Sequence, residues 1–294
     1  MSVGHDGHLL GIDFGGTKMA VALARPDGTI VEQRRLPTNA ADGAERALGR
    51  AMDVVEKLVS ESGRSILSAG VATPGVVRDD GIDLAPNVPG WEDLRLARAL
   101  TDRIGDLPVT VWNDLNAAAL AEMRHGALRG ADPGLVVGLG TGVAAAMTIG
   151  GTIVHGYRGA AGEIGYTPVG SGELTASEPS LELEAAGRAL DELAAANGLP
   201  DGAAGLTGSG SPALSAELDR RIDAVARAMI SMCLLVDPQR VVVFGGMTRS
   251  SRIVDRLAAQ LTRRLPFPPE FTVSRFAQDA PLVGALTLAA ERMT

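Results

Sequence analysis

Residues 9–18, LLGIDFGGTK, form an apolar run that ends in an aspartate, a glycine pair, a threonine and a lysine. The apolar stretch MAVALA (19–24), the turn PDGT and the stretch IVEQRRL (30–36) follow directly. Short apolar runs separated by turn residues are typical of strands joined as hairpins. The N-terminal segment therefore predicts a three-stranded antiparallel meander.

Helical periodicity begins behind this meander. Apolar side chains recur every three to four residues from Asp42 to Ser62, which predicts a helix. The elements expected next are a strand at 67–75, a loop carrying APNVPGW at 85–91, a helix at 93–104 and a strand at 108–114. Strands that alternate with helices predict an α/β fold with a parallel sheet.

The second half repeats the pattern of the first. LVVGLGTG (135–142) resembles LLGIDFGGT, and VAAAMTI (143–149) and TIVHG (152–156) continue it as a second hairpin. The further elements expected are helices at 180–197, 212–236, 251–264 and from 281, strands at 241–246 and 272–276, and a surface loop at 198–212. We therefore expect two lobes with a cleft between them, at 1–112 and 113–280, with the last helix (281–294) packing back on the first lobe.

Composition excludes several classes of protein. The 294 residues carry 27 Lys and Arg against 35 Asp and Glu, a net charge of −8, which argues against a broad face for nucleic acid or for an anionic membrane. No apolar stretch has the length of a membrane helix or the form of a signal peptide. The single cysteine, Cys233, forbids an intrachain disulfide and suits a reducing compartment. We expect a cytoplasmic protein whose partners are small molecules.

Three glycine turns follow predicted strands and could cradle phosphate groups. The P-loop pattern is absent, and Val143 stands where a dinucleotide-binding fingerprint needs its last glycine. The turns contain Gly15, Gly16, Thr17 and Lys18; Gly140, Thr141 and Gly142; and Gly245 and Gly246. Backbone N–H groups at such turns can donate to phosphoryl oxygens, and the Asp13 carboxylate could hold the hydrated Mg²⁺ of a nucleotide. Each turn taken alone is equally consistent with an ordinary hairpin.

Polar residues at two further positions have both a functional and a structural interpretation. Asp114 stands where a predicted strand gives way to the helical run AAALAE, so it is either a group facing the cleft or an ordinary N-cap. Asn87 lies between Pro86 and Pro89, a setting that also suits a plain turn. The four histidines lack metal-ligand spacing and are expected in loops or at the surface.

Six motifs in one order carry a family resemblance. They are DFGGTK, APNVPGW, VWNDLNAAALAE, GLGTGV, AGEIGY and VVVFGGM. In this order and spacing the chain resembles, over nearly its whole length, the ROK family of bacterial sugar kinases and related repressors. The resemblance implies two ribonuclease-H-like lobes of the actin-like ATPase type, with ATP and a sugar meeting in the cleft.

The resemblance also implies roles for individual residues. Asp114 is the expected catalytic base, and Asp13 is expected to hold Mg²⁺ through the nucleotide. The residues expected to bind the sugar are Asn87, Asn113, Asp114, Glu163, Tyr166 and Glu182, and those expected to bind ATP are Asp13, Gly15, Gly16, Thr17, Lys18, Thr141, Gly142, Gly245 and Gly246. For Glu163 and Glu182 the structural alternatives are a solvated loop charge and a plain amphipathic helix.

The chain departs from the family at the zinc motif. ROK proteins commonly follow GEIGH with a cluster of three cysteines, and the four corresponding positions here are Tyr166, Glu173, Thr175 and Ser180. These side chains do not form a zinc ligand set, so we expect a zinc-free variant. The family histidine also contacts the sugar, and Tyr166 can donate one hydroxyl hydrogen bond in its place.

The hypothesis from sequence is an ATP- and Mg²⁺-dependent kinase for the 6-hydroxyl of a hexose. Glucose or an amino-glucose such as glucosamine or kanosamine is the first choice, while N-acetylmannosamine, N-acetylglucosamine and fructose stay open. A catalytically silent sugar sensor and a repressor are the other classes. The repressor is disfavoured because such relatives carry an N-terminal winged helix, whereas the first phosphate motif here starts at Asp13. A homodimer or homotetramer is expected.

Overall fold

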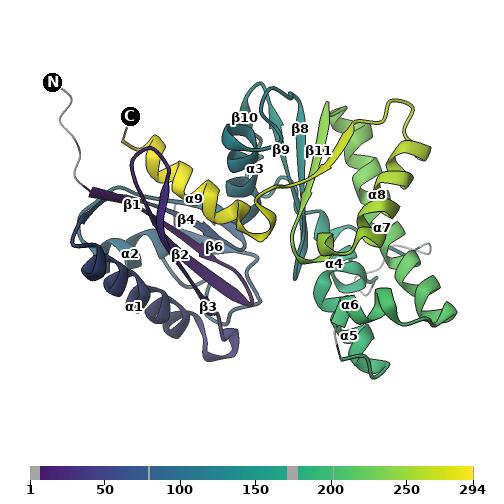
Figure 1. Cartoon of the computed structure of the whole chain (residues 1–294), viewed down its shortest axis with the longest axis horizontal. Helices are drawn as coiled ribbons and strands as arrows, with labels where there is room; N and C mark the ends of the chain where they lie inside the picture. The colour runs from purple at the N-terminus through teal and green to yellow at the C-terminus, as the bar shows by residue number, and fades with distance from the viewer. Residues whose placement is uncertain (1–6, 79, 171–177, 201, 294) are drawn as a thin grey trace. The chain divides into compact units, whose positions relative to one another are not determined.

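The computed structural model describes residues 7–78, 80–170, 178–200 and 202–293. The chain forms two compact units, each built on a five-stranded sheet (Figure 1). The first unit contains Met1–Glu122, His155–Ala160 and Asp279–Thr294, and the second contains Met123–Val154 and Ala161–Gln278. The expected boundary at residue 112 does not coincide with this division, because the following helix up to Glu122 and the segment His155–Ala160 both lie in the first unit.

The first sheet has the strand order β3-β2-β1-β4-β7. Its strands are β1 (Gly7–Phe14), β2 (Lys18–Ala24), β3 (Ile30–Pro37), β4 (Ser65–Thr73) and β7 (Val109–Asn113). The pairs β1–β2 and β2–β3 are antiparallel, and β1–β4 and β4–β7 are parallel. The predicted meander is therefore followed by two parallel crossovers.

The second sheet repeats this topology, in the order β10-β9-β8-β11-β12. Its strands are β8 (Gly134–Leu139), β9 (Val143–Ile149), β10 (Thr152–Ile153), β11 (Arg240–Phe244) and β12 (Glu270–Val273). Again the first three strands in sequence are antiparallel, and β8–β11 and β11–β12 are parallel. The repeat predicted from the two strand-and-glycine motifs is confirmed.

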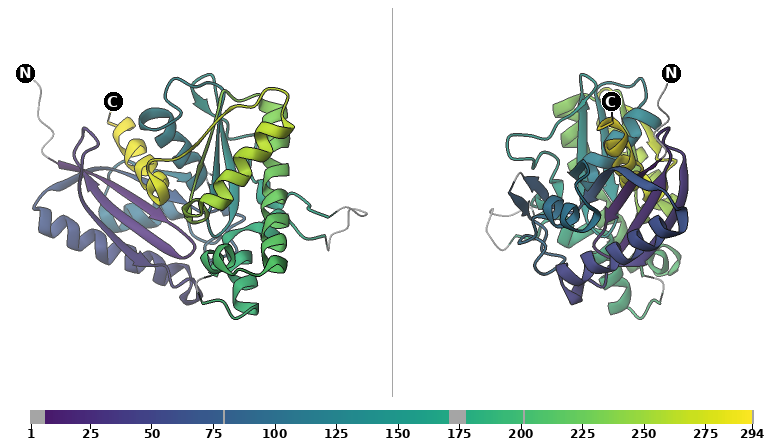
Figure 2. Two further views of the ribbon diagram at one scale, coloured as in Figure 1. Left: turned by 45° about the vertical axis from the view of Figure 1, so that its right-hand side comes forward. Right: turned by 90° about the vertical axis from the view of Figure 1, so that its left-hand side faces the viewer.

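Residues along β1 alternate between two buried faces of the first sheet. Leu10 and Ile12 pack in one cluster with α1 (Ala44–Ser62), whereas Leu9 packs in another cluster with α9 (Ala280–Glu291). The two helices accordingly lie on opposite faces of the sheet (Figures 1 and 2). A strand that is buried on both faces reads as a continuous apolar run, which explains the sequence LLGIDF.

The C-terminal helix α9 packs very closely on the first sheet. A Cβ atom built on Gly70 of β4 would overlap the carbonyl group of Ala285 in α9, and one built on Gly284 would overlap the Ala117 carbonyl of α3 (Asp114–His125). Only glycine permits helix and strand backbones to approach in this way. The last helix of the chain thus belongs to the N-terminal unit.

The core of the second unit lies between its sheet and a layer of helices. Alternate residues of β8 and β11, such as Leu135, Val137 and Val241, pack in one cluster with side chains of these helices. The helices are α4 (Leu181–Ala185), α5 (Gly187–Ala196), α6 (Gly202–Gly208), α7 (Pro212–Val236) and α8 (Ser251–Arg264). Figure 2 shows α7 and α8 beside the sheet.

Several elements differ from the sequence-based expectation. The helix expected at 180–197 is two helices, because Ala186 is extended (φ −67°, ψ 161°), and the expected loop at 198–212 contains α6. A short hairpin of β5 (Val76–Arg78) and β6 (Gly81–Asp83) was not anticipated, and the helix expected at 93–104 is α2 (Leu96–Ile104). Within the described residues, no helix is both long and apolar enough to cross a bilayer.

Candidate functional site

The carboxyl ends of parallel strands meet at one edge of the first sheet. Asp13 of β1 pairs with Ala72 of β4, and Thr73 of β4 pairs with Asn113 at the end of β7. Ligands of open α/β sheets bind outside the carboxyl ends of the strands. The topology therefore brings the first phosphate motif and the Asn113–Asp114 pair to the same edge.

The turn between β1 and β2 is held in a tight conformation that needs glycine. The Gly15 N–H donates to the Lys18 carbonyl at 3.1 Å, and a Cβ on Gly15 would lie only 2.5 Å from that same oxygen. Thr38, directly after β3, secures the turn, because its hydroxyl donates to the Gly15 carbonyl at 2.5 Å and its N–H donates to the Thr17 carbonyl at 2.9 Å. Thr17 and Lys18 are exposed, so the turn presents its outer side to solvent.

Asn113 caps helix α3. Its Oδ1 accepts hydrogen bonds from the N–H groups of Leu115 (2.9 Å) and Asn116 (3.1 Å), and its Nδ2 donates to the Gly75 carbonyl at 3.0 Å. The half-buried Asp114 is the first residue of the helix, and its Oδ1 accepts from the Leu115 N–H at 2.8 Å. Asn113 therefore serves as the N-cap by accepting the N–H groups of the first turn, which weakens the interpretation of Asp114 as an ordinary N-cap.

The Asp13 carboxylate lies within the electrostatic influence of two others at this edge. Burial raises the pKa of Asp13 well above its usual range, the carboxylates of Asp114 and Asp279 raise this pKa further, and only the Arg35 guanidinium opposes them. Arg35 itself forms an ion pair with Asp279. A half-buried carboxylate with two anionic neighbours fits the hard oxygen-ligand chemistry of a hydrated Mg²⁺ ion, which would offset their repulsion.

The loop that carries Asn87 is anchored beside this turn by Trp91. The Trp91 ring is buried, its Nε1 donates to the Thr73 hydroxyl at 2.8 Å, and its centroid lies 5.0 Å from that of Phe14. Asn87 itself is exposed, and its Cβ lies 3.9 Å from where a Cβ on Gly16 would stand. The structure thus places a residue predicted to bind sugar next to one predicted to bind phosphate.

In the second unit the two remaining glycine turns lie side by side. They follow β8 and β11, which are adjacent parallel strands. Gly245 adopts φ 108°, and a Cβ there would stand 2.5 Å from the Leu139 carbonyl oxygen and 3.0 Å from the Gly140 nitrogen. The Gly187 N–H, at the start of α5, donates to the Gly140 carbonyl at 2.9 Å. The turns predicted to bind ATP through Thr141, Gly142, Gly245 and Gly246 therefore form one continuous backbone surface.

Glu182 joins this surface to the predicted sugar residues of the second unit. Its Oε2 accepts from the Val143 N–H at 3.3 Å, and a Cβ on Gly142 would stand 2.6 Å from this oxygen. Burial, and next the Glu182 carboxylate, raise the pKa of the half-buried Glu163. Neither glutamate is simply a solvated surface charge. Tyr166, on the same short 3-10 helix that follows Glu163, is 56% exposed.

Besides Tyr166, three residues stand at the positions of the family's zinc motif, namely Glu173, Thr175 and Ser180. Ser180 caps α4, with its hydroxyl accepting from the Leu183 N–H at 3.4 Å. Glu173 and Thr175 lie outside the described residues. Over the part of the chain that is described, no three His, Cys, Asp or Glu side chains gather in a way that could hold a metal ion.

Several site-bordering residues were not singled out from the sequence. Arg35 and Asp279 gave no local signal of their role, because the contact between them joins positions 244 residues apart. His155 lies in a loop, as expected, but it is half-buried: its ring stands edge-on to Trp112, with the ring centroids 4.8 Å apart, and burial lowers its pKa. The expectation was wrong for His8, which is buried in β1. The tryptophan of APNVPGW was the only available hint, because an aromatic in a polar loop is commonly an anchor.

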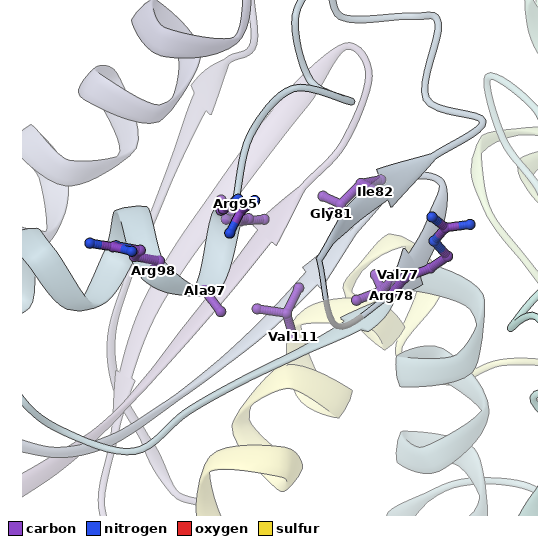
Figure 3. A pocket seen from close by; sticks show the side chains of 9 residues that line it. Val77, Arg78, Gly81, Ile82, Arg95, Ala97, Arg98 and Val111 are labelled. Carbon is purple, nitrogen blue, oxygen red and sulfur yellow. The ribbon is translucent and has the colours of Figure 1, made fainter.

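A cavity of about 270 Å³ lies elsewhere on the first unit, and none of the predicted site residues lines it. Its wall is formed by the β5–β6 hairpin, the start of α2 and Val111 (Figure 3). The side chains of Arg78 and Arg98 point away from each other in Figure 3, and Arg78 pairs with Asp83 at 2.8 Å. This cavity is therefore separate from the candidate site.

Known proteins resemble this chain in sequence. The family model described as "ROK family" matches residues 9–292. The glucokinase of Halalkalibacterium halodurans is 38% identical over 165 residues, which are 54% of this chain and 49% of that protein. An N-acetylmannosamine kinase of Escherichia coli is 32% identical over 292 residues, or 95% of this chain and 97% of that protein.

A solved structure extends the likeness to three dimensions. The ROK family glucokinase of Streptomyces griseus, in complex with glucose and AMPPNP, superposes with a TM-score of 0.80 at 27% identity, covering 97% of this chain and all of that one. With strand order, glycine turns and family model in agreement, the chain belongs to the ROK family.

Proposed function

We propose that this chain is an ATP- and Mg²⁺-dependent kinase that phosphorylates the 6-hydroxyl of a hexose, with glucose or an amino-glucose as the preferred acceptor. The observation that carries the proposal is the edge of the first sheet. There Asp114 is oriented at the start of a helix already capped by Asn113, next to an Asp13 whose neighbours favour a bound cation. Glucokinases and an N-acetylmannosamine kinase among the relatives support the same reaction class.

In this proposal Mg·ATP supplies the phosphoryl group and neutralises part of its charge. Asp13 would hold the hydrated metal, and the exposed turn at Gly15, Gly16, Thr17 and Lys18 would donate to phosphate oxygens. Asp114 accepts the proton of the attacking hydroxyl. The Leu115 N–H fixes one of its carboxylate oxygens, so the base keeps its orientation before the sugar arrives.

The remaining predicted residues would orient the sugar. Glu163, Glu182 and Asn87 would offer hydrogen-bond partners to ring hydroxyls, and the Asn113 amide, which donates one N–H to the Gly75 carbonyl, carries a second N–H that would donate to one more. Two carboxylates in a partly buried setting also favour an ammonium group. This supports the choice of an amino-glucose beside glucose.

Other acceptors and a second class remain as alternatives. An N-acetylmannosamine kinase is the next candidate, because a relative of that name is 32% identical over nearly the whole chain. N-acetylglucosamine and fructose follow. A silent sugar sensor is disfavoured by the intact Asp13 turn and by Asp114.

We also propose a cytoplasmic enzyme, where ATP is available, that is assembled as a homodimer or homotetramer and has no zinc site. Leu234 and Leu235 of α7 are 61% and 87% exposed, which supports a surface used for association. No nucleic-acid or membrane partner is proposed, in keeping with the net charge of −8.

The test is ADP release with Mg·ATP across glucose, mannose, fructose, glucosamine, kanosamine, N-acetylglucosamine and N-acetylmannosamine, with Asp114→Asn as the blank. Product from glucose is then offered to a dehydrogenase specific for the 6-phosphate, which reports the position of transfer. One strongly preferred sugar that gives a 6-phosphate supports the proposal. Sugar binding in calorimetry without any turnover across the panel would instead indicate a sensor.

A further inference from the structure

A row of side chains crosses the first sheet next to the proposed metal ligand. Asp13 of β1 pairs with Ala20 of β2, and Ala20 pairs with Arg35 of β3. Residues paired in this way share one face, and two strand spacings put the outer Cα atoms about 10 Å apart. The face is the one covered by α9, since Ala20 packs with Leu282. The small alanine leaves room for the long Arg35 side chain to extend over it.

The start of α9 supplies the partner of that arginine. Asp279 occupies the position before the helix, yet its carboxylate caps no N–H of α9 and instead forms the ion pair with Arg35. The two side chains are 39% and 31% exposed, so solvent does not fully screen them. A positive and a negative charge are thus held together on the face of the sheet that carries Asp13.

We propose that Arg35 and Asp279 are positioning residues that set how strongly the Asp13 edge holds a divalent cation. The idea rests on the proposed function, since it concerns the metal that accompanies ATP. Arg35 carries a fixed positive charge, which weakens the attraction between the Asp13 carboxylate and the metal ion. Asp279 adds a negative charge and also holds the guanidinium in place through their ion pair.

Because the charges of Arg35 and Asp279 have opposite signs, their effects can be tested directly with Mn²⁺ as the probe. Binding of Mn²⁺ in the presence of ADP is followed by the electron paramagnetic resonance signal of the ion. Arg35→Gln should tighten Mn²⁺ binding, and Asp279→Asn should weaken it, each by about three- to ten-fold for a partly screened charge at this range. The double variant should return to within about two-fold of wild type.

The chain provides a matched control for Arg35. Arg34 is the next residue on the same strand but faces the α1 side, where it pairs with Glu32 and Glu61. Arg34→Gln makes the same change in net charge and should leave Mn²⁺ affinity unchanged. For Asp279, the control is Asp53→Asn on the exposed face of α1. Equal affinities for Arg35→Gln and Arg34→Gln, in variants with wild-type melting temperatures, would overturn the inference.

Turnover adds a second readout when a sugar is phosphorylated. The Mg²⁺ concentration for half-maximal rate should shift in the same two directions, while kcat at saturating Mg²⁺ changes little. A wild-type protein that binds Mn·ADP but phosphorylates no sugar contradicts the proposed function alone. If the protein phosphorylates a sugar but its Mn²⁺ affinity is the same in both variants as in wild type, only the role of the Arg35–Asp279 pair is contradicted.

Discussion

At the scale of single residues, the separation of roles between Asn113 and Asp114 is the central feature of the site. Asn113 satisfies the first turn of α3, so Asp114 can change without loss of the cap. Asp114→Asn should therefore keep the melting temperature and hold the sugar dissociation constant within a few fold. Its kcat should fall by about 10²–10⁴, the usual contribution of a general base. The measurement is steady-state kinetics beside calorimetric sugar binding.

The control for this substitution is Asp102→Asn, which makes the same chemical change on the exposed side of α2. Its turnover should equal that of wild type. Wild-type turnover in Asp114→Asn itself would show that another group accepts the proton. A lowered melting temperature in that variant would show that Asp114, and not Asn113 alone, caps the helix.

The raised pKa of Glu163 leads to a prediction about how the stability of the protein depends on pH. Burial and Glu182 raise the pKa of Glu163 in the folded protein, whereas in the unfolded chain it stays near about 4.3. Stability is then greatest below the unfolded value and falls as pH rises towards the folded one, because only the unfolded chain ionises freely in that window. Glu163→Gln removes this loss. Its melting temperature should match wild type at pH 4 and exceed it at pH 7.

Glu56→Gln serves as the comparison, because Glu56 is exposed on α1. Differential scanning of both variants over the same pH range makes the test. A Glu163 variant whose pH profile coincides with that of Glu56→Gln, or which melts below wild type at pH 7, would contradict the electrostatic account.

At the scale of elements, the docking of α9 depends on two glycines. A methyl group at position 70 would overlap the Ala285 carbonyl, so Gly70→Ala should push the helix from the sheet. Overpacking of this kind costs about 1–3 kcal/mol, sometimes more. Gly49→Ala is the matched control: Gly49 lies within α1, with open space around a built Cβ. That change should stabilise the protein by about 0.5–1 kcal/mol.

Thermal unfolding followed by circular dichroism separates the two cases. We expect Gly70→Ala to melt below wild type and Gly49→Ala to melt above it. If Gly70→Ala melted at the wild-type temperature, the close packing of α9 on β4 would be wrong.

The same elements show what sequence patterns can and cannot predict. The two sheets follow from apolar runs that end in glycine turns, because strand pairing and tight turns leave local signals. Helix α6 was missed since GAAGLTG has a loop composition, and its helix depends on packing of Leu206 in the core. The break at Ala186 was missed because it serves the contact of Gly187 with the distant Gly140.

The candidate site follows the same rule. Its motif residues stand at the ends of predicted strands, so Asp13, Asn113 and Asp114 could be singled out from the motifs. Arg35 and Asp279 could not, because their contact depends on how β3 and α9 meet in space. A family motif identifies the residues within it. Residues such as Arg35 and Asp279, whose contact joins distant elements, are not part of any motif.

At the scale of the whole molecule, the exposed leucines at the end of α7 lead to a prediction about assembly. Leu235 is 87% exposed and adjoins Leu234, an arrangement that costs free energy in water and that association would relieve. Light scattering coupled to gel filtration should give two or four times the 30.2 kDa of one chain. Leu235→Glu should reduce the mass to that of a single chain, because a charge would be buried without a partner.

The control is Ile30→Glu, at a 40% exposed site on β3, which should leave the oligomer intact. A wild-type protein that elutes as a monomer at micromolar concentration would contradict the assembly, and an unchanged mass in Leu235→Glu would place the interface elsewhere.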